Sequence, residues 1–324
     1  MKKITTALAA LSFLSIGLVP AVADQQNTIV IIDSGFDTTT IQSNIVEEVC
    51  ITTSSGCNNG TGFEIGPGAA QTDIAIASKF ISDWGHGTLM AESAIDANPD
   101  VDIILIRNSK VYASGNVLFG GEGSLELALQ WVADNADTYN IVGVSMSRGS
   151  HTYVLNNGTA RKQLTYLQIY NKQLEKMGDN PKFRASKIAF TKKLNAAVAK
   201  MNALPDIACP ASDTLSNLVT QLAQNNIASF FATGNDYNSR YVDSPACLDD
   251  AVAVAAANSS GTLLPQSNVA PNTDFAVEAP NTSVATAKLA GMWSKLYNGS
   301  YSSTYELIAT NATNSHSWSA LFVD

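Results

Sequence analysis

Charged residues are scarce in this chain of 324 residues: they make up 15% of it, against about 25% in an average soluble protein. Hydrophobic residues reach 45%, which excludes a disordered chain and is enough for a sizeable core. Basic residues are the scarcer charged kind, with 19 against 28 acidic residues and a net charge of −9. Because general binding of nucleic acid needs a basic face, we expect no nucleic-acid partner.

Long apolar runs are also lacking, except for one at the N-terminus. A short basic start precedes the apolar residues 4–19, and Ala21-Val22-Ala23 fits the small-x-small cleavage pattern. A run of about 16 residues is short for a membrane span, which needs about 20. We therefore predict a bacterial Sec-type signal peptide at 1–23, a protein secreted or periplasmic from Asp24 onward, and no membrane span.

Cysteine is rare, and all four residues can be named: Cys50, Cys57, Cys209 and Cys247. Their spacings do not resemble a zinc site, and an exported protein favours disulfides. Four cysteines allow three pairings, among which the sequence alone does not choose rigorously. Cys50 and Cys57 flank a Thr/Ser/Gly turn, so we predict this local pair, and the pair Cys209–Cys247 then follows by elimination.

Short β-branched and apolar runs alternate with helical patterns over most of the chain. This alternation predicts an α/β fold whose parallel sheet is covered by helices on both faces. The strands are expected at 28–32, 101–106, 141–144, 228–233 and 251–257, and the helices at 87–97, 124–136 and 213–225.

Residues 151–205 depart from this alternation. They hold ten Lys/Arg and two Asp/Glu, whereas the chain without them and without residues 1–23 has seven Lys/Arg against 26 Asp/Glu. Apolar residues recur every three or four positions over 164–177 and again over 190–204, and Gly178-Asp179-Asn180-Pro181 lies between the two stretches. We predict a basic helical hairpin with one apolar stripe on each helix, whose simplest interpretation is a solvated structural insertion.

Four polar residues stand at predicted strand ends or helix starts. Asp33 follows the first buried strand, at the edge of an open sheet where ligands bind. His86, one of only three histidines, lies where a loop becomes a helix, and Asn235 follows a later strand. Ser283 begins a late helix, whose free N–H groups stabilise a developing oxyanion. Each residue alone has an ordinary explanation as a turn or cap residue, but their joint order is more specific.

The order Asp…His…Asn…Ser, together with the motifs around these residues, resembles that of the subtilisin-like serine proteases, the subtilases. The resemblance extends from about residue 28 to about residue 311, apart from the insertion. The matching segments are IVIIDSGF (29–36), HGTLMA (86–91), VSMSRG (144–149), FATGN (231–235) and NTSVA with LAG (281–285 and 289–291).

The resemblance implies a three-layer subtilisin-like fold over residues 24–324 and a secreted serine endopeptidase acting on proteins or peptides. Asp33, His86 and Ser283 would form the catalytic triad, and the amide of Asn235 and the N–H of Ser283 the oxyanion hole. No cofactor and no metal is expected, because residues 97–100 leave no room for the calcium loop of many relatives. Further substrate-binding residues implied by the resemblance are Ser145, Ser147, Arg148, Gly149 and Gly234.

Several positions depart from the family pattern. Asn281 replaces a glycine, and because Asn tolerates positive φ well, we expect the turn to survive. Thr286-Ala287-Lys288 replaces the segment that usually follows the nucleophile, and Glu92 stands where a small residue is usual. All four chemical groups are nevertheless kept, which favours an active enzyme over a catalytically weak homologue that binds peptides or proteins.

The usual long prosegment has no room, because about ten residues separate the predicted cleavage point from Asp33. We therefore expect the insertion 151–205 to gate the cleft, or an inhibitor or chaperone partner to take the place of the prosegment; opposite charges favour docking of the insertion on the acidic body. An α/β-hydrolase esterase is disfavoured, because its triad order is Ser…acid…His within G-x-S-x-G. A serine-carboxyl peptidase would place an acid where His86 stands.

Overall fold

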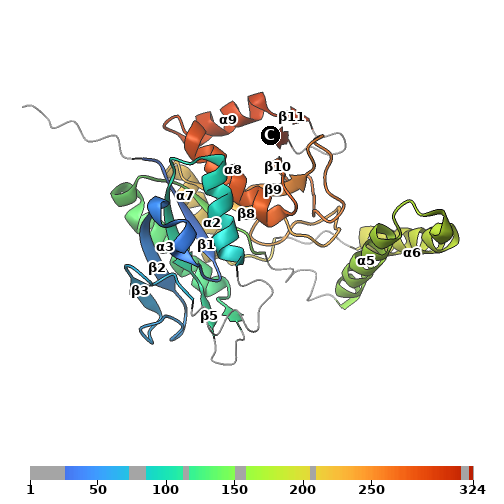
Figure 1. The fold of residues 1–324 in the computed structure, drawn as a ribbon, viewed down its shortest axis with the longest axis horizontal. Coiled ribbons are helices and arrows are strands. Elements are labelled where there is room, and N and C mark those ends of the chain that lie inside the picture. The colour runs from blue at the N-terminus through green and yellow to red at the C-terminus, as the bar shows by residue number, and fades with distance from the viewer. Residues whose placement is uncertain are drawn as a thin grey trace, which may run out of the picture.

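The computed structural model of the chain describes residues 26–72, 85–111, 117–149, 158–204, 209–314 and 321–323. These residues form a layered α/β body and a helical hairpin that projects from it (Figure 1). The predicted signal peptide, 1–23, lies outside the described residues. Within the described ranges, none of the helices combines the length and hydrophobicity that crossing a membrane requires.

The centre of the body is one sheet with the strand order β11-β12-β10-β9-β8-β7-β1-β4-β2-β3. Neighbouring strands from β12 to β2 are parallel, whereas β11 and β3 pair antiparallel at the two edges. A separate antiparallel pair consists of β5 and β6. The strands are β1 (Thr28–Asp33), β2 (Ile45–Ile51), β3 (Phe63–Ile65), β4 (Asp102–Arg107), β5 (Ser109–Val111), β6 (Val117–Phe119), β7 (Ile141–Met146), β8 (Ala228–Ala232), β9 (Val252–Ala257), β10 (Phe275–Glu278), β11 (Thr313–Asn314) and β12 (Leu321–Val323).

Helices cover both faces of this sheet. One apolar cluster joins α2 and α8 to the sheet, and a second joins α3 and α7 to its other face. The helices of the body are α2 (His86–Ala97), α3 (Glu122–Tyr139), α7 (Asp213–Gln224), α8 (Thr282–Leu296) and α9 (Tyr301–Asn311), with short 3-10 turns η1 (Thr38–Thr40) and η2 (Gln42–Asn44). The five predicted strands and three predicted helices are all present, with ends shifted by a few residues.

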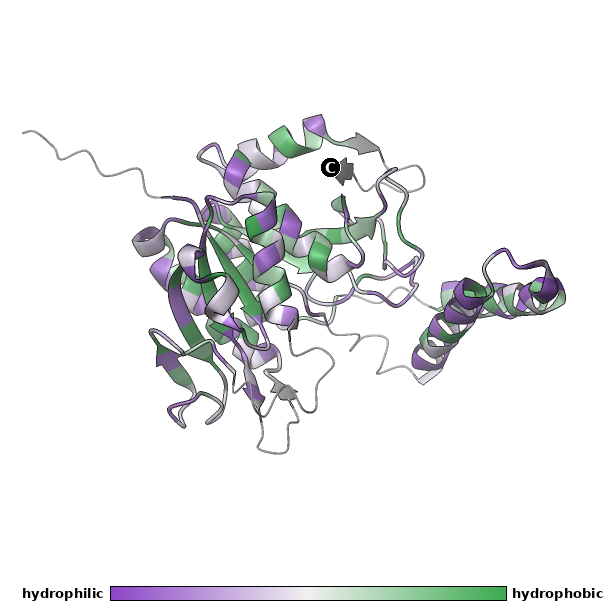
Figure 2. Ribbon diagram, viewed as in Figure 1, coloured by the Kyte–Doolittle hydropathy of each residue, from purple (hydrophilic) through white to green (hydrophobic). Residues whose placement is uncertain are grey.

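The uninterrupted apolar runs of the central strands follow from this layering. In β1, Ile29 and Ile31 belong to the cluster with α2 and α8, while Val30 and Ile32 belong to the cluster with α3 and α7. Because successive side chains of a strand point to opposite faces, a strand covered on both faces must be apolar at every position. The central strands are correspondingly hydrophobic in Figure 2.

The basic segment forms a helical hairpin, as predicted. It consists of α5 (Gly158–Met177), the 3-10 turn η3 (Pro181–Phe183) and α6 (Arg184–Asn202). Gly178 ends α5 with a positive φ of 48°, a common way for a helix to stop. A small apolar cluster of its own connects the base of the hairpin to two tyrosines of the body, Tyr237 and Tyr241.

Both predicted disulfides are present. The Cα atoms of Cys50 and Cys57 are 5.7 Å apart, and those of Cys209 and Cys247 are 5.5 Å apart. The first bridge closes the turn after β2. The second ties the segment before α7 to the loop between β8 and β9, close to where the hairpin returns to the body.

Candidate active site

Asp33 and His86 meet at the carboxyl edge of the sheet. Asp33 is the last residue of β1 and His86 the first residue of α2, and Asp33 Oδ2 lies 2.8 Å from His86 Nδ1. The other carboxylate oxygen, Oδ1, accepts hydrogen bonds from the N–H (2.6 Å) and hydroxyl (3.0 Å) of Ser34. The carboxylate is therefore held on both oxygens, and its side chain is only 5% exposed against 31% for His86.

Gly87 allows this close approach of α2 to the end of β1. A Cβ added at Gly87 would lie 2.4 Å from the carbonyl oxygen of Gly35 and 3.1 Å from Cβ of Asp33. Any larger residue would push the start of α2, and with it His86, away from Asp33. The glycine of the His-Gly-Thr motif thus has a packing role in the pairing of acid and imidazole.

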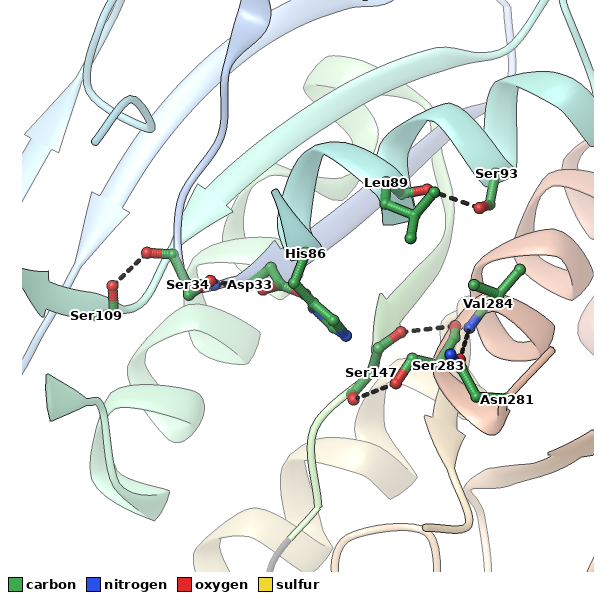
Figure 3. A network of polar contacts seen from close by, with 10 residues as sticks. All are labelled: Asp33, Ser34, His86, Leu89, Ser93, Ser109, Ser147, Asn281, Ser283 and Val284. Carbon is green, nitrogen blue, oxygen red and sulfur yellow. Dashed lines mark hydrogen bonds and ion pairs between the residues drawn. The ribbon is translucent and has the colours of Figure 1, made fainter. Parts of the chain in front are cut away.

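Ser283 lies in the first turn of α8, across from β7. Its Oγ donates to the carbonyl oxygen of Ser147 (3.2 Å), and Ser147 Oγ donates back to the carbonyl oxygen of Ser283 (2.9 Å). These reciprocal bonds attach the start of α8 to the residue that follows β7. In Figure 3 the imidazole of His86 points from Asp33 toward Ser147 and Ser283.

Asn281 is the N-cap of α8, and the expectation of a positive φ at this position is wrong. Its backbone is extended (φ −162°), and its side-chain oxygen accepts from the N–H of Val284 at 3.0 Å. Asn is among the best N-cap residues because its oxygen satisfies an N–H that has no partner within the helix. Asn281 therefore replaces the usual glycine by capping the helix.

Asn235 reaches the same helix start from β8. Its Oδ1 accepts from the N–H of Thr282 at 3.1 Å, which fixes the orientation of the amide and directs its NH₂ group to the other side. The preceding Gly234 has a φ of 104° and is packed against Asp243 and Asn268. A Cβ added at Gly234 would lie 2.4 Å from Asp243 Oδ2 and 2.4 Å from Asn268 Nδ2. Only glycine fits this turn, which places Asn235 beside α8.

Sequence reasoning missed Asn268, which organises the loop after Asn235. Its Oδ1 accepts from the N–H groups of Asp236 (2.9 Å) and Asn238 (3.1 Å), and its own N–H donates to the carbonyl oxygen of Gly234 (2.8 Å). Its Nδ2 donates to Asp236 Oδ2 at 3.2 Å. An asparagine in an irregular segment gives no local signal of such a role.

Apart from Gly234, which follows β8, the predicted substrate-binding residues lie at or just after the end of β7, in different environments. Arg148 and Gly149 line a cavity of about 370 Å³ between the starts of α3 and α7. Burial lowers the pKa of the Arg148 guanidinium, and the negative charge of Asp33 opposes that shift. Ser145 is buried inside β7 and Ser147 binds Ser283. The lining also includes Gly120, Gly121, Glu122, Leu125, Met146, Pro210, Leu215, Ser244 and Pro245.

This arrangement brings a carboxylate, an imidazole and a helix-start serine to one edge of a parallel sheet. The set can take up and return a proton through His86 and can stabilise a negative oxygen near the start of α8. Within the described ranges, no cluster of three or more His, Cys, Asp or Glu side chains could hold a metal ion.

This chain is similar to known proteins in its fold but not in its sequence. No family model matches this sequence, and no curated protein matches it significantly. Among solved structures, the chain is similar to a protease from Pseudoalteromonas arctica, with a TM-score of 0.61 and 12% identity over 93% of this chain and 88% of that one. The chain has a subtilisin-like fold.

Two further solved structures share this fold with the chain. A lanthipeptide protease has a TM-score of 0.54 and 13% identity over 89% of this chain and 81% of its own. The self-cleaved protease domain of PatA has a TM-score of 0.52 and 16% identity over 89% and 90%, respectively. The fold class predicted from the sequence is confirmed, although the sequence is only 12–16% identical to these proteases.

Proposed function

We propose that the protein is a secreted serine endopeptidase whose catalytic residues are Asp33, His86 and Ser283. The observation that carries this proposal is the 2.8 Å contact between Asp33 Oδ2 and His86 Nδ1, with the imidazole directed toward the start of α8. The subtilisin-like fold supports it, since the similar solved structures are proteases. Secretion is supported by the N-terminal pattern at 1–23 and by the two disulfides.

In the proposed reaction, Ser283 Oγ attacks the carbonyl carbon of a peptide bond while His86 Nε2 takes the hydroxyl proton. The hydroxyl now donates to the Ser147 carbonyl, so the Oγ–H bond must turn toward the imidazole before attack. His86 then gives the proton to the leaving amine, and a water molecule repeats the cycle on the acyl-enzyme. Asp33 orients the imidazole and stabilises its charged form.

The negative oxygen of the tetrahedral intermediate would be stabilised at the start of α8. The N–H of Ser283 belongs to the first helical turn, whose N–H groups have no acceptor within the helix. The NH₂ group of Asn235 would supply the second donor, since its amide is already oriented by the Thr282 N–H. The charge would develop on the peptide oxygen only after attack, so these donors would favour the transition state over the bound substrate.

We also propose that the hairpin of α5 and α6 influences access to this site. Its first helix, α5, is attached to the segment directly after Asn235: Gln168 Nε2 donates to Asp236 Oδ1 (2.6 Å), and the Tyr237 hydroxyl donates to Glu175 Oε1 (2.9 Å). Arg240 adds hydrogen bonds to the carbonyls that end α6. Deletion of 155–204 should therefore change the cleavage of folded proteins or peptides, and unchanged cleavage of both would refute gating.

Labelling with a fluorophosphonate probe tests the catalytic proposal directly. We expect the exported protein to be labelled, and Ser283→Ala and His86→Ala to abolish labelling. Ser186→Ala is a matched control, because Ser186 is exposed on α6, and it should label like the unchanged protein. If neither the full chain nor the chain without residues 155–204 is labelled, the result would favour a catalytically weak homologue that binds peptides or proteins.

A further inference from the structure

The far end of the hairpin carries a concentration of positive charge. We call residues 172–193 the hairpin tip: they include the end of α5, η3 and the first half of α6. The tip holds seven Lys/Arg and two Asp/Glu. Both acidic groups are engaged, because Glu175 accepts from the Tyr237 hydroxyl and Asp179 pairs with Lys187 at 3.2 Å. The remaining cations lie on exposed surface.

The hairpin tip also exposes large apolar side chains. Ile188 is 64% exposed and Phe183 is 43% exposed, and Phe183 stands between the exposed cations Lys182 and Arg184. No side chain of the tip is buried, whereas the base of the hairpin buries residues such as Leu164 and Met201. Two helices alone cannot cover their apolar stripes on all sides, so the tip presents apolar surface to its surroundings.

Most of this surface lies apart from the acidic body. The base contacts the segment around Tyr237 and Tyr241, Glu175 at the near edge of the tip accepts from the Tyr237 hydroxyl, and the hairpin projects away from the sheet (Figure 1). Hydrophilic and hydrophobic residues alternate along the projecting helices in Figure 2. Outside 1–23 and 151–205 the chain has seven Lys/Arg against 26 Asp/Glu, so an anionic surface would repel the body and attract the tip.

We propose that the hairpin tip docks on a bilayer surface that contains anionic phospholipids. Phe183 and Ile188 enter the headgroup region, and the surrounding lysines and arginines bind the lipid phosphates. The tip is the projecting end of a hairpin whose apolar side chains are spaced among cations, which suits a fluid surface of separate headgroups. An acidic folded protein would instead need a groove that fits around this projecting end.

Vesicle co-sedimentation tests this proposal without depending on the protease activity. The mature chain carrying Ser283→Ala is mixed with vesicles of phosphatidylcholine alone or with phosphatidylglycerol added, at physiological ionic strength. We expect sedimentation with the mixed vesicles only. The triple variant Lys176→Gln, Lys182→Gln and Arg184→Gln should weaken binding by about a hundredfold, and Phe183→Ser should weaken it by about tenfold.

The matched control removes the same charge from the base of the hairpin. Arg161→Gln, Lys162→Gln and Lys200→Gln lie at the start of α5 and the end of α6, more than about 20 Å along the helices from the substituted tip residues. This exceeds the Debye length of about 8 Å, so the control should bind like the parent. Circular dichroism checks that each variant folds.

Three outcomes would overturn the proposal. One is equal sedimentation with both kinds of vesicle, and another is binding that the tip variant and the control variant retain alike. The third is absence of vesicle binding combined with tip-dependent capture on polyglutamate beads, which would assign the tip to acidic polypeptides instead. Because Ser283 is already replaced, none of these outcomes bears on the proposed catalysis.

Discussion

Gly291 lies in α8 where this helix packs against α2. A Cβ added there would lie 2.2 Å from the carbonyl oxygen of Ala94, whereas ordinary contact between carbon and oxygen needs more than 3 Å. Gly291→Ala must therefore move the two helices apart by about 1 Å. Ser283 stands eight residues before Gly291 and His86 eight residues before Ala94, so each lies about 12 Å along its helix from the contact.

The expected loss follows from this geometry. If the helices separate as rigid bodies, the imidazole moves by about 1 Å relative to Ser283, and a misplacement of that size costs about a hundredfold in rate. Overpacking should lower the free energy of unfolding by about 1–3 kcal/mol, of which the better helix propensity of Ala restores up to about 1 kcal/mol. The labelling rate should therefore fall about a hundredfold, while the free energy of unfolding falls by no more than about 3 kcal/mol.

Fluorophosphonate labelling rates and urea unfolding measure the two effects. Gly158→Ala is the control, because it makes the same chemical change at the start of α5, where a Cβ would meet nothing within 4 Å. This variant should keep the labelling rate and the stability of the parent. A Gly291→Ala variant that labels as fast as the parent would refute the idea that the contact between α2 and α8 sets the distance between His86 and Ser283.

Three further predictions concern the proposed acid of the triad, a buried carboxyl and the disulfides. Asp33→Asn should keep the fold but lower the labelling rate by about 10⁴, because an amide favours the wrong imidazole tautomer; a loss below tenfold would contradict the assigned role. Burial raises the pKa of the Asp274 carboxyl above 3.8, against opposing hydrogen bonds from Ala253 and Tyr305. The folded chain then holds a proton that the unfolded chain has lost, so the free energy of unfolding should fall as pH rises from 3.8 through the raised pKa. Asp274→Asn should remove this slope and the exposed Asp100→Asn should not, as followed by urea unfolding against pH. Replacing Cys209 and Cys247 by Ser should lower the free energy of unfolding by about 4 kcal/mol, and replacing Cys50 and Cys57 should lower it by about 2.5 kcal/mol. The difference arises because the Cys209–Cys247 bridge spans 38 residues and the Cys50–Cys57 bridge only seven. Equal losses of stability in thermal unfolding would argue against the loop-entropy explanation.

Elements with a strong local pattern could be predicted, and those stabilised by their neighbours could not. β1 and β9 are apolar at nearly every position, and α7 has a regular apolar stripe with Ser212 as its cap. β2 was not predicted, since Glu47 and Glu48 interrupt its pattern and pairing with β4 stabilises it as a strand. Short strands such as β10 likewise depend on neighbouring strands for their hydrogen bonds.

The candidate site likewise contains residues that could be predicted from the sequence and residues that could not. The order of Asp33, His86, Asn235 and Ser283 could be read along the chain, because each motif is short and contains its own turn or helix start. The roles of Asn268 and Asn281 could not be read, since one depends on hydrogen bonds to residues about 30 positions away and the other on a backbone conformation. Glycine and asparagine at the same position can begin a helix with different backbone conformations.

Periodicity and turn chemistry are local properties, so they were sufficient to predict the layered α/β class, the basic hairpin and the residues at the sheet edge. Which atoms meet depends on tertiary packing: the pairing of Asp33 with His86, the attachment of Ser283 to Ser147, and the projection of the hairpin from the segment after Asn235. These contacts join residues 50 or more positions apart in the sequence. Residues so far apart come into contact only when helices and strands pack around a shared core.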